Sequence, residues 1–89
     1  MNKYIVEFLG TMFLAFVIFS TNNYLAIGVA LAVISLIGIP ISGGAFNPAV
    51  AIAFVGAGKI AGNEIIPYIV AEVAGALAAF QLAKMVIHN

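Results

Sequence analysis

The strongest candidate for a functional site in this 89-residue sequence is the tripeptide Asn47-Pro48-Ala49. Asn is a preferred N-cap and Pro is favoured at the first helical position, so a helix is expected to begin here. A helix start presents free backbone N–H groups and the positive end of the helix dipole, and the Asn amide adds a donor. On the wall of a pore, such a site would donate hydrogen bonds to a neutral molecule and repel cations and protons. The alternative is an ordinary helix cap in a loop.

Few other side chains are suited to catalysis or metal binding. The sequence has three Lys, three Glu and one His, and it contains no Asp, Arg or Cys. Without Cys there is no disulfide and no thiolate metal site. We therefore expect no enzyme, no cofactor and no metal site. The net charge is zero, which leaves a nucleic-acid partner no electrostatic basis.

The composition indicates a membrane protein. Hydrophobic residues make up 65% of the chain and charged residues only 7%, against about a quarter charged in a typical soluble protein. Three apolar runs predict helices over 4–20, 24–39 and 64–87, and a membrane span needs about 17–25 residues. A signal peptide is the alternative for the first run, but Glu7 lies inside it and no Ala-x-Ala site follows. We expect an integral protein of the plasma (inner) membrane.

The segment 41–57 is too short and too irregular to be a further span. Pro40 is expected to end the second helix at Ile39, and the Gly43-Gly44 pair favours irregular backbone. The apolar helix that follows has eight residues up to Val55, or about 12 Å of length. Irregular backbone is tolerated at membrane depth only where protein or a wet cavity covers it. We predict a re-entrant loop and half-helix rather than an amphipathic helix on the surface, because 41–58 carries no charge.

Two glutamates lie within the predicted spans. Ionisable residues in membrane helices are costly and usually face the interior of the bundle, so Glu7 and Glu72 are expected there. The alternatives are an interfacial position for Glu7 and a simple polar packing role for Glu72. Small residues also recur every four positions, and such stripes predict close helix contacts. They are Ala71, Gly75 and Ala79 in the third span, and Gly28 and Ala32 in the second.

Three stretches resemble the major intrinsic protein family of aquaporins and glycerol facilitators. Residues 7–11 resemble its first-helix signature, residues 42–50 its first pore loop, and residues 67–76 its third helix. The resemblance implies an all-α membrane protein with three transmembrane helices and one re-entrant half-helix, which is one inverted-repeat unit of that family. It also implies a passive channel for water or small neutral solutes such as glycerol.

The resemblance implies roles for particular residues. Asn47 would donate to the permeant, while Pro48 and Ala49 would fix the half-helix start. Carbonyls of the pore loop would accept hydrogen bonds from the permeant, and the two buried glutamates would support the loop. The residues concerned are Gly43, Gly44 and Ala45 for the carbonyls, and Glu7 and Glu72 for the support.

The sequence also departs from the family pattern. Ala45 stands where the family commonly has His. Ile27 stands where an aromatic residue usually lines the narrow filter, and by this resemblance it would contact the permeant. There is no second Asn-Pro-Ala and no Arg. The usual filter is therefore not assembled from these residues, which leaves the preference for water over glycerol open.

The family's channels contain two such units, so a second half-unit is an expected partner. It would be an inverted copy of this chain, a complementary half, or the remainder of a truncated or split gene product. The alternative function is a non-conducting accessory or truncated subunit that only packs against other helices. A fragment of an ion-coupled transporter, in which Glu72 would titrate, is a weaker third interpretation.

Overall fold

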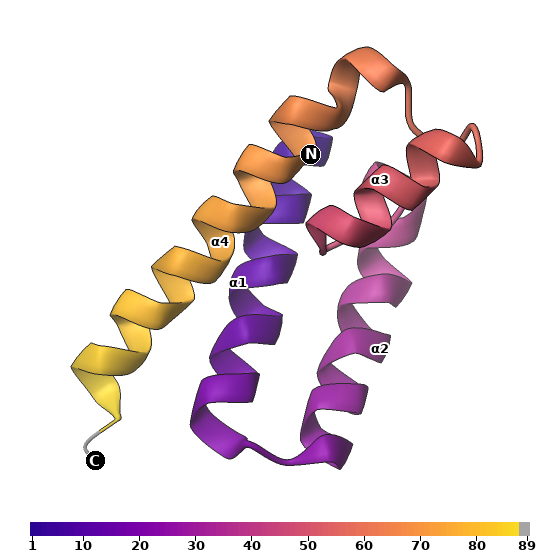
Figure 1. The fold of residues 1–89 in the computed structure, drawn as a ribbon. Coiled ribbons are helices and arrows are strands. Elements are labelled where there is room, and N and C mark those ends of the chain that lie inside the picture. Colours follow the sequence, from indigo (N-terminus) through magenta and orange to yellow (C-terminus); the bar gives the residue numbers. More distant parts are fainter. Residues whose placement is uncertain (88–89) are drawn as a thin grey trace.

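The computed structural model describes residues 1–87, and every regular element in that range is helical (Figure 1). The helices are α1 (Lys3–Thr21), α2 (Tyr24–Ser42), α3 (Pro48–Gly56) and α4 (Ile65–Val86), and the 3-10 turn η1 (Gly62–Glu64) leads directly into α4. Three helices, α1, α2 and the stretch Gly62–Val86, are long and apolar enough to cross a membrane. The molecule is 42 Å long, close to the roughly 40–45 Å of a bilayer with its headgroups. The predicted all-α class with three spanning helices is confirmed.

The long helices form a small bundle in which α1 contacts both α2 and α4 (Figure 1). A two-residue turn at Asn22 and Asn23 makes α2 antiparallel to α1. The chain then returns through α3, so α4 runs parallel to α1. The helix α2 contacts α1, and the short helix α3 contacts α4. Figure 1 shows α3 at the end of the bundle where α2 ends and α4 begins.

The α1–α4 contact depends on one glycine. A Cβ added at Gly75 would collide with the backbone of Phe8 and Met12, so the two helices approach at backbone distance there. Ala79, one turn further along α4, is fully buried. The predicted small-residue stripe of α4 therefore packs in this contact.

The small residues of α2 behave differently. Gly28 has nothing within 4 Å of its ideal Cβ position, and Ala32 is exposed. The expected close contact at this stripe is therefore not formed within residues 1–87. The buried face of α2 is instead the one that carries Ala30, Ile34, Gly38 and Ser42.

The predicted end of α2 at Ile39 is wrong. Pro40 lies inside the helix, which continues to Ser42 and ends at Gly43 in the left-handed conformation. Pro40 removes one backbone donor near the helix end, but two tertiary hydrogen bonds hold the last turn. The Ser42 hydroxyl donates to Glu7, and the Ser42 carbonyl accepts from Tyr68. These buried contacts outweigh the local preference of proline.

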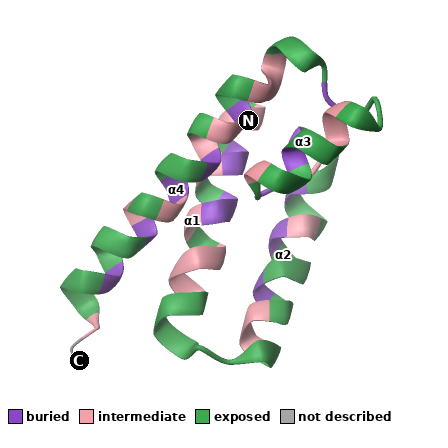
Figure 2. Ribbon diagram, viewed as in Figure 1, coloured by how far each residue is buried: buried purple, intermediate pink, exposed green. Residues whose placement is uncertain are grey.

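The outer faces of the helices are exposed (Figure 2), and many of the residues there are large and apolar. Leu36 on α2 is 78% exposed and Leu77 on α4 is 60% exposed. In water this surface would drive aggregation, whereas lipid accepts it at no cost. The buried residues form narrow stripes along the faces where the helices meet.

Candidate functional site

The segment after α2 enters the bundle and stops near the middle of α1. It leaves α2 at Ser42, whose hydroxyl lies 2.6 Å from the Glu7 carboxylate in the second turn of α1. Further along the segment, the Phe46 carbonyl accepts a hydrogen bond of 3.2 Å from the Thr11 hydroxyl. Thr11 lies eight residues from the start of α1 at Lys3, or about 12 Å along the helix.

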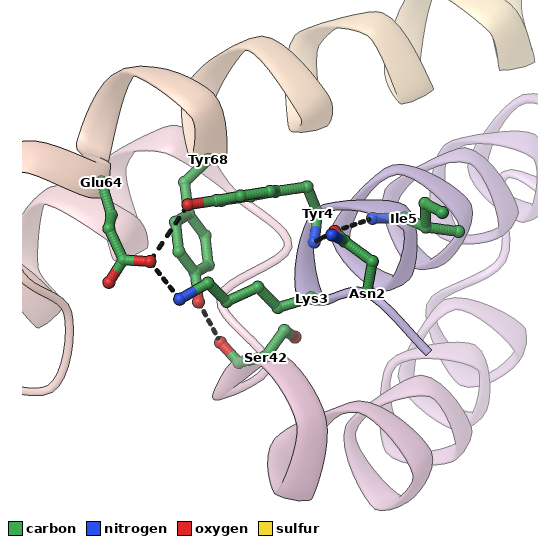
Figure 3. A network of polar contacts seen from close by, with 7 residues as sticks. All are labelled: Asn2, Lys3, Tyr4, Ile5, Ser42, Glu64 and Tyr68. Carbon is green, nitrogen blue, oxygen red and sulfur yellow. Dashed lines mark hydrogen bonds and ion pairs between the residues drawn. The ribbon is translucent and has the colours of Figure 1, made fainter.

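The chain then returns to the end from which it entered. After α3, Glu64 forms an ion pair with Lys3, and the Tyr4 hydroxyl donates to Glu64 at 3.0 Å (Figure 3). The Tyr68 hydroxyl of α4 donates to the Ser42 carbonyl at 2.8 Å (Figure 3). Entry and return therefore both lie beside the first turns of α1, while the tip reaches its middle. This is the geometry of a re-entrant segment.

Glycine permits the turn into the bundle. Gly43 and Gly44 have φ angles of 87° and 71°, a region that side chains with a Cβ rarely adopt. At Gly44 an added Cβ would also lie 2.8 Å from the Ile39 side chain. The pair therefore allows the chain to reverse immediately after α2.

Phe46 is the anchor of the tip, and its role was not found from the sequence. Its ring is 3% exposed and occupies the space that a Cβ on Gly10 of α1 or on Gly38 of α2 would need. Its φ angle of 52° is left-handed, which costs a non-glycine residue about 1–2 kcal/mol. The two isolated glycines inside apolar helices, Gly10 in α1 and Gly38 in α2, were the available signal.

Glu7 fixes the backbone of the tip. Its side chain is fully buried. One oxygen accepts the Phe46 N–H at 2.8 Å, and the other accepts the Ser42 hydroxyl at 2.6 Å. Hydrogen bonds to a carboxylate are stronger than those between neutral groups. Together with the Thr11 bond, they hold Phe46 in its strained conformation.

Glu72 occupies a different environment. It is also fully buried, and neither of its oxygens has a hydrogen-bond partner within residues 1–87. It lies near the Glu7 carboxyl and the backbone N–H of Asn47. The structure therefore places Glu72 beside the loop, but it makes no direct hydrogen bond to it.

Asn47 begins α3 at the tip. Its Oδ1 accepts the backbone N–H groups of Ala49 at 2.8 Å and Val50 at 3.4 Å, and Pro48 occupies the first helical turn. Asn47 is exposed. Oδ1 is engaged by the cap, and within residues 1–87 the two N–H groups of the amide nitrogen make no hydrogen bond. The residue is therefore a helix cap and a fixed donor at once.

Acceptor groups precede this donor along the chain. Within the described range, the carbonyls of Gly43, Gly44 and Ala45 accept no hydrogen bond. The Ala45 side chain is buried in a cluster with Ala51, Ile60 and Tyr68. The structure thus leaves three consecutive carbonyl groups without a protein donor, next to a free amide donor.

The structure does not bring Ile27 to this site. Ile27 lies in the first turn of α2 and is half-buried. The loop follows the other end of that helix, 15 residues away at Ser42, or about 22 Å along the axis. Contact between Ile27 and a permeant stays a prediction.

A groove continues from Asn47 along the bundle, on the side that α3 does not reach. Its volume is about 330 Å³, and its lining is mostly apolar. Its walls come from the middle and later turns of α1 and from the middle turns of α4, and Glu72 is part of its lining. The lining residues are Thr11, Leu14, Ala15, Ile18, Phe46, Asn47, Pro48, Glu72, Val73, Ala76 and Leu77.

Comparison with known proteins identifies the family. The profile of the major intrinsic protein family matches residues 20–89, which include α2, the re-entrant segment and α4. The chain belongs to the major intrinsic protein family. Members of this family are integral membrane channels for water or small solutes. The three long helices of this member are suited to crossing that membrane by their length and apolar composition.

Several curated relatives share the family. A glycerol uptake facilitator protein-like 6 of Lactiplantibacillus plantarum is 38% identical over 94% of this chain and 43% of its own length. Aquaporin Z of Brucella melitensis is 39% identical over 89% of this chain and 41% of its own length. The aquaglyceroporin AqpS of Rhizobium meliloti is 40% identical over 71% of this chain and 27% of its own length. This major intrinsic protein therefore spans less than half the length of the relatives it matches. No solved structure matches it.

Proposed function

We propose that this protein forms one half of a pore for the passive transport of water or small neutral solutes such as glycerol. The observation that carries the proposal is the Asn47 amide, which is held by its own helix cap with both N–H groups free near the middle of α1. The names of the relatives, which include an aquaporin, an aquaglyceroporin and a glycerol facilitator, support this class of permeant.

The chemistry of the tip suits a neutral permeant. Asn47 supplies donors, and the carbonyls of Gly43, Gly44 and Ala45 supply acceptors in sequence. A water molecule or an alcohol exchanges hydrogen bonds with both kinds of group without meeting a charge. The N-terminal end of α3 carries the positive end of its dipole, which opposes the passage of cations. We expect the permeant to pass along this line of groups, in the plasma membrane.

A second half-unit would complete the pore. α3 has nine residues and is about 14 Å long, so it crosses about half of the hydrocarbon core. The groove beyond Asn47 is lined by the middle and later turns of α1 and the middle turns of α4, including Leu14, Ile18 and Leu77. An apolar half-helix of the same kind, entering from the opposite side, would pack against this apolar lining and cover the exposed tip. We propose an inverted copy of this chain as the occupant.

Flux through vesicles tests the pore. The variant Asn47→Asp keeps an N-cap residue but replaces the free amide donor with a carboxylate. The matched control is Asn23→Asp, because Asn23 caps α2 in the same way at the end of the bundle. Osmotic swelling with water and with glycerol should fall to the level of empty vesicles for Asn47→Asp and stay near wild type for Asn23→Asp. Wild-type flux equal to that of empty vesicles would reject the self-paired pore.

Topology mapping distinguishes the partners. Tags at both termini should be found on both sides of the membrane in comparable amounts if inverted copies pair. A single orientation would instead favour a complementary half. If the protein is instead a non-conducting accessory subunit, vesicles should show no flux with this chain alone or with a complementary half. Charged substitutions of Asn47 should then leave the packing with other helices unchanged.

A further inference from the structure

Two glutamates are buried side by side between α1 and α4. Glu7 and Glu72 are the largest side chains in the molecule that are fully buried. They lie close to each other and come from different helices. Their hydrogen bonding is opposite, because Glu7 accepts at both oxygens while neither oxygen of Glu72 has a partner among the described residues.

Within residues 1–87, no lysine is placed to neutralise this pair. Lys3 pairs with Glu64 at the end of the bundle. Lys59 lies 4.2 Å from the Phe54 ring centroid, and Lys84 lies 5.4 Å from that of Phe80. These are all the lysines of the chain, which contains no Arg.

The elements packed around the pair add no further charge. Neither α2 nor the segment from Gly43 to Gly58 contains an ionisable residue, apart from Tyr24 at the far end of α2. The ionisable neighbours on α1 and α4 are Tyr4 and Tyr68, and the hydroxyl of each is committed as a donor to another group. Two adjacent carboxylates in this apolar interior would carry two uncompensated negative charges.

Two buried acids at one site do not both ionise. Glu7 accepts the Phe46 N–H and the Ser42 hydroxyl, so both of its oxygens already serve as acceptors. We propose that Glu72 is the protonated member, a carboxylic acid whose hydroxyl donates to the Glu7 carboxylate, so that the two acids hold one proton and position the re-entrant loop together. Glu72 thereby acts on the loop through Glu7 as a positioning residue.

Infrared spectroscopy reads this protonation state independently of transport. Protein with ¹³C-labelled glutamate, embedded in hydrated bilayers at neutral pH, should show the carbonyl stretch of a protonated carboxylic acid. The band should disappear in Glu72→Gln. It should remain in Glu64→Gln, the matched control at the end of the bundle. Absence of the band in the wild-type protein, or its survival in Glu72→Gln, would overturn the proposal.

The conservative variant Glu72→Gln distinguishes a hydrogen bond donated by residue 72 from a role of that side chain in filling space. Gln at position 72 keeps the size of the side chain and supplies an amide N–H to Glu7, so thermal unfolding in detergent should match the wild type. Leu at the same position keeps comparable bulk but removes the donor, so it should unfold at a lower temperature. Equal stability of Glu72→Leu and Glu72→Gln would contradict a donor role. If Glu72→Leu does not fold at all, the infrared comparison of the wild type with Glu72→Gln still decides.

Discussion

Three helices of this protein start with an Asn cap of the same kind, and two of these starts, those of α2 and α3, lie at very different places. Asn23 accepts the N–H groups of Leu25 and Ala26 at 3.0 Å each and begins α2 at the end of the bundle. Asn47 begins α3 with the same pattern of bonds, but it lies at the tip of the re-entrant segment. The cap therefore defines where a helix begins in the sequence and says nothing about depth in the bundle.

The difference lies in what holds each start in place. The start of α2 follows a two-residue turn after α1, so its position is set by the chain itself. The start of α3 depends on contacts distant in sequence, in which Glu7, Gly10 and Thr11 of α1 hold Phe46. A nine-residue helix is too short to be stable alone. Its existence and its depth are therefore properties of the bundle.

Gly10→Leu is expected to cause the largest loss of stability among the variants that disturb the start of α3 but leave the start of α2 in place. The added side chain needs the space of the Phe46 ring, and overpacking of this kind typically costs about 1–3 kcal/mol. The tip and α3 should move out of the bundle while α2 stays in place. Thermal unfolding in detergent measures the stability, and a spin-label distance between positions 49 and 12 reports the displacement of the tip.

Gly28→Leu is the matched control, because it puts the same side chain on a helix glycine with nothing within 4 Å of it. It should leave both the stability and the distance unchanged. Equal losses in the two variants would show that contact with Phe46 is not the cause of the loss, because Leu favours the helix more than Gly at both positions.

The same contrast explains which features of the fold and of the candidate site could be predicted from the sequence. The Asn47-Pro48 start, the irregular Gly43-Gly44 turn and the inward position of Glu7 follow from local preferences and from the cost of burying charge. The course of α2 through Pro40 does not, because Ser42 is held by partners 35 and 26 residues away in the sequence. The role of Phe46 was equally hidden, since a left-handed phenylalanine is stable only when its neighbours enforce it.

A smaller effect is expected when either cap is removed. Asn47→Ala and Asn23→Ala each leave two helix N–H groups without the side-chain acceptor, at a cost of about 1 kcal/mol. The losses of stability should be similar, because the bonding is similar. Vesicle flux should fall only for Asn47→Ala, which also removes the free amide donor at the tip. A loss of flux of the same size in Asn23→Ala would remove the distinction between the two starts.

The smallest effect is expected from Glu64→Gln, which tests whether the return of the chain at the end of the bundle matters as much as its buried tip. The substitution removes the ion pair with Lys3 but leaves an oxygen that still accepts the Tyr4 hydroxyl. An ion pair near the membrane surface is screened by solvent and salt. Glu64→Gln should therefore unfold at a slightly lower temperature than the wild type at low salt and at the same temperature at high salt. A loss that exceeds those of the cap variants and persists at high salt would place the main anchor of α3 at the surface and not at Glu7 and Phe46.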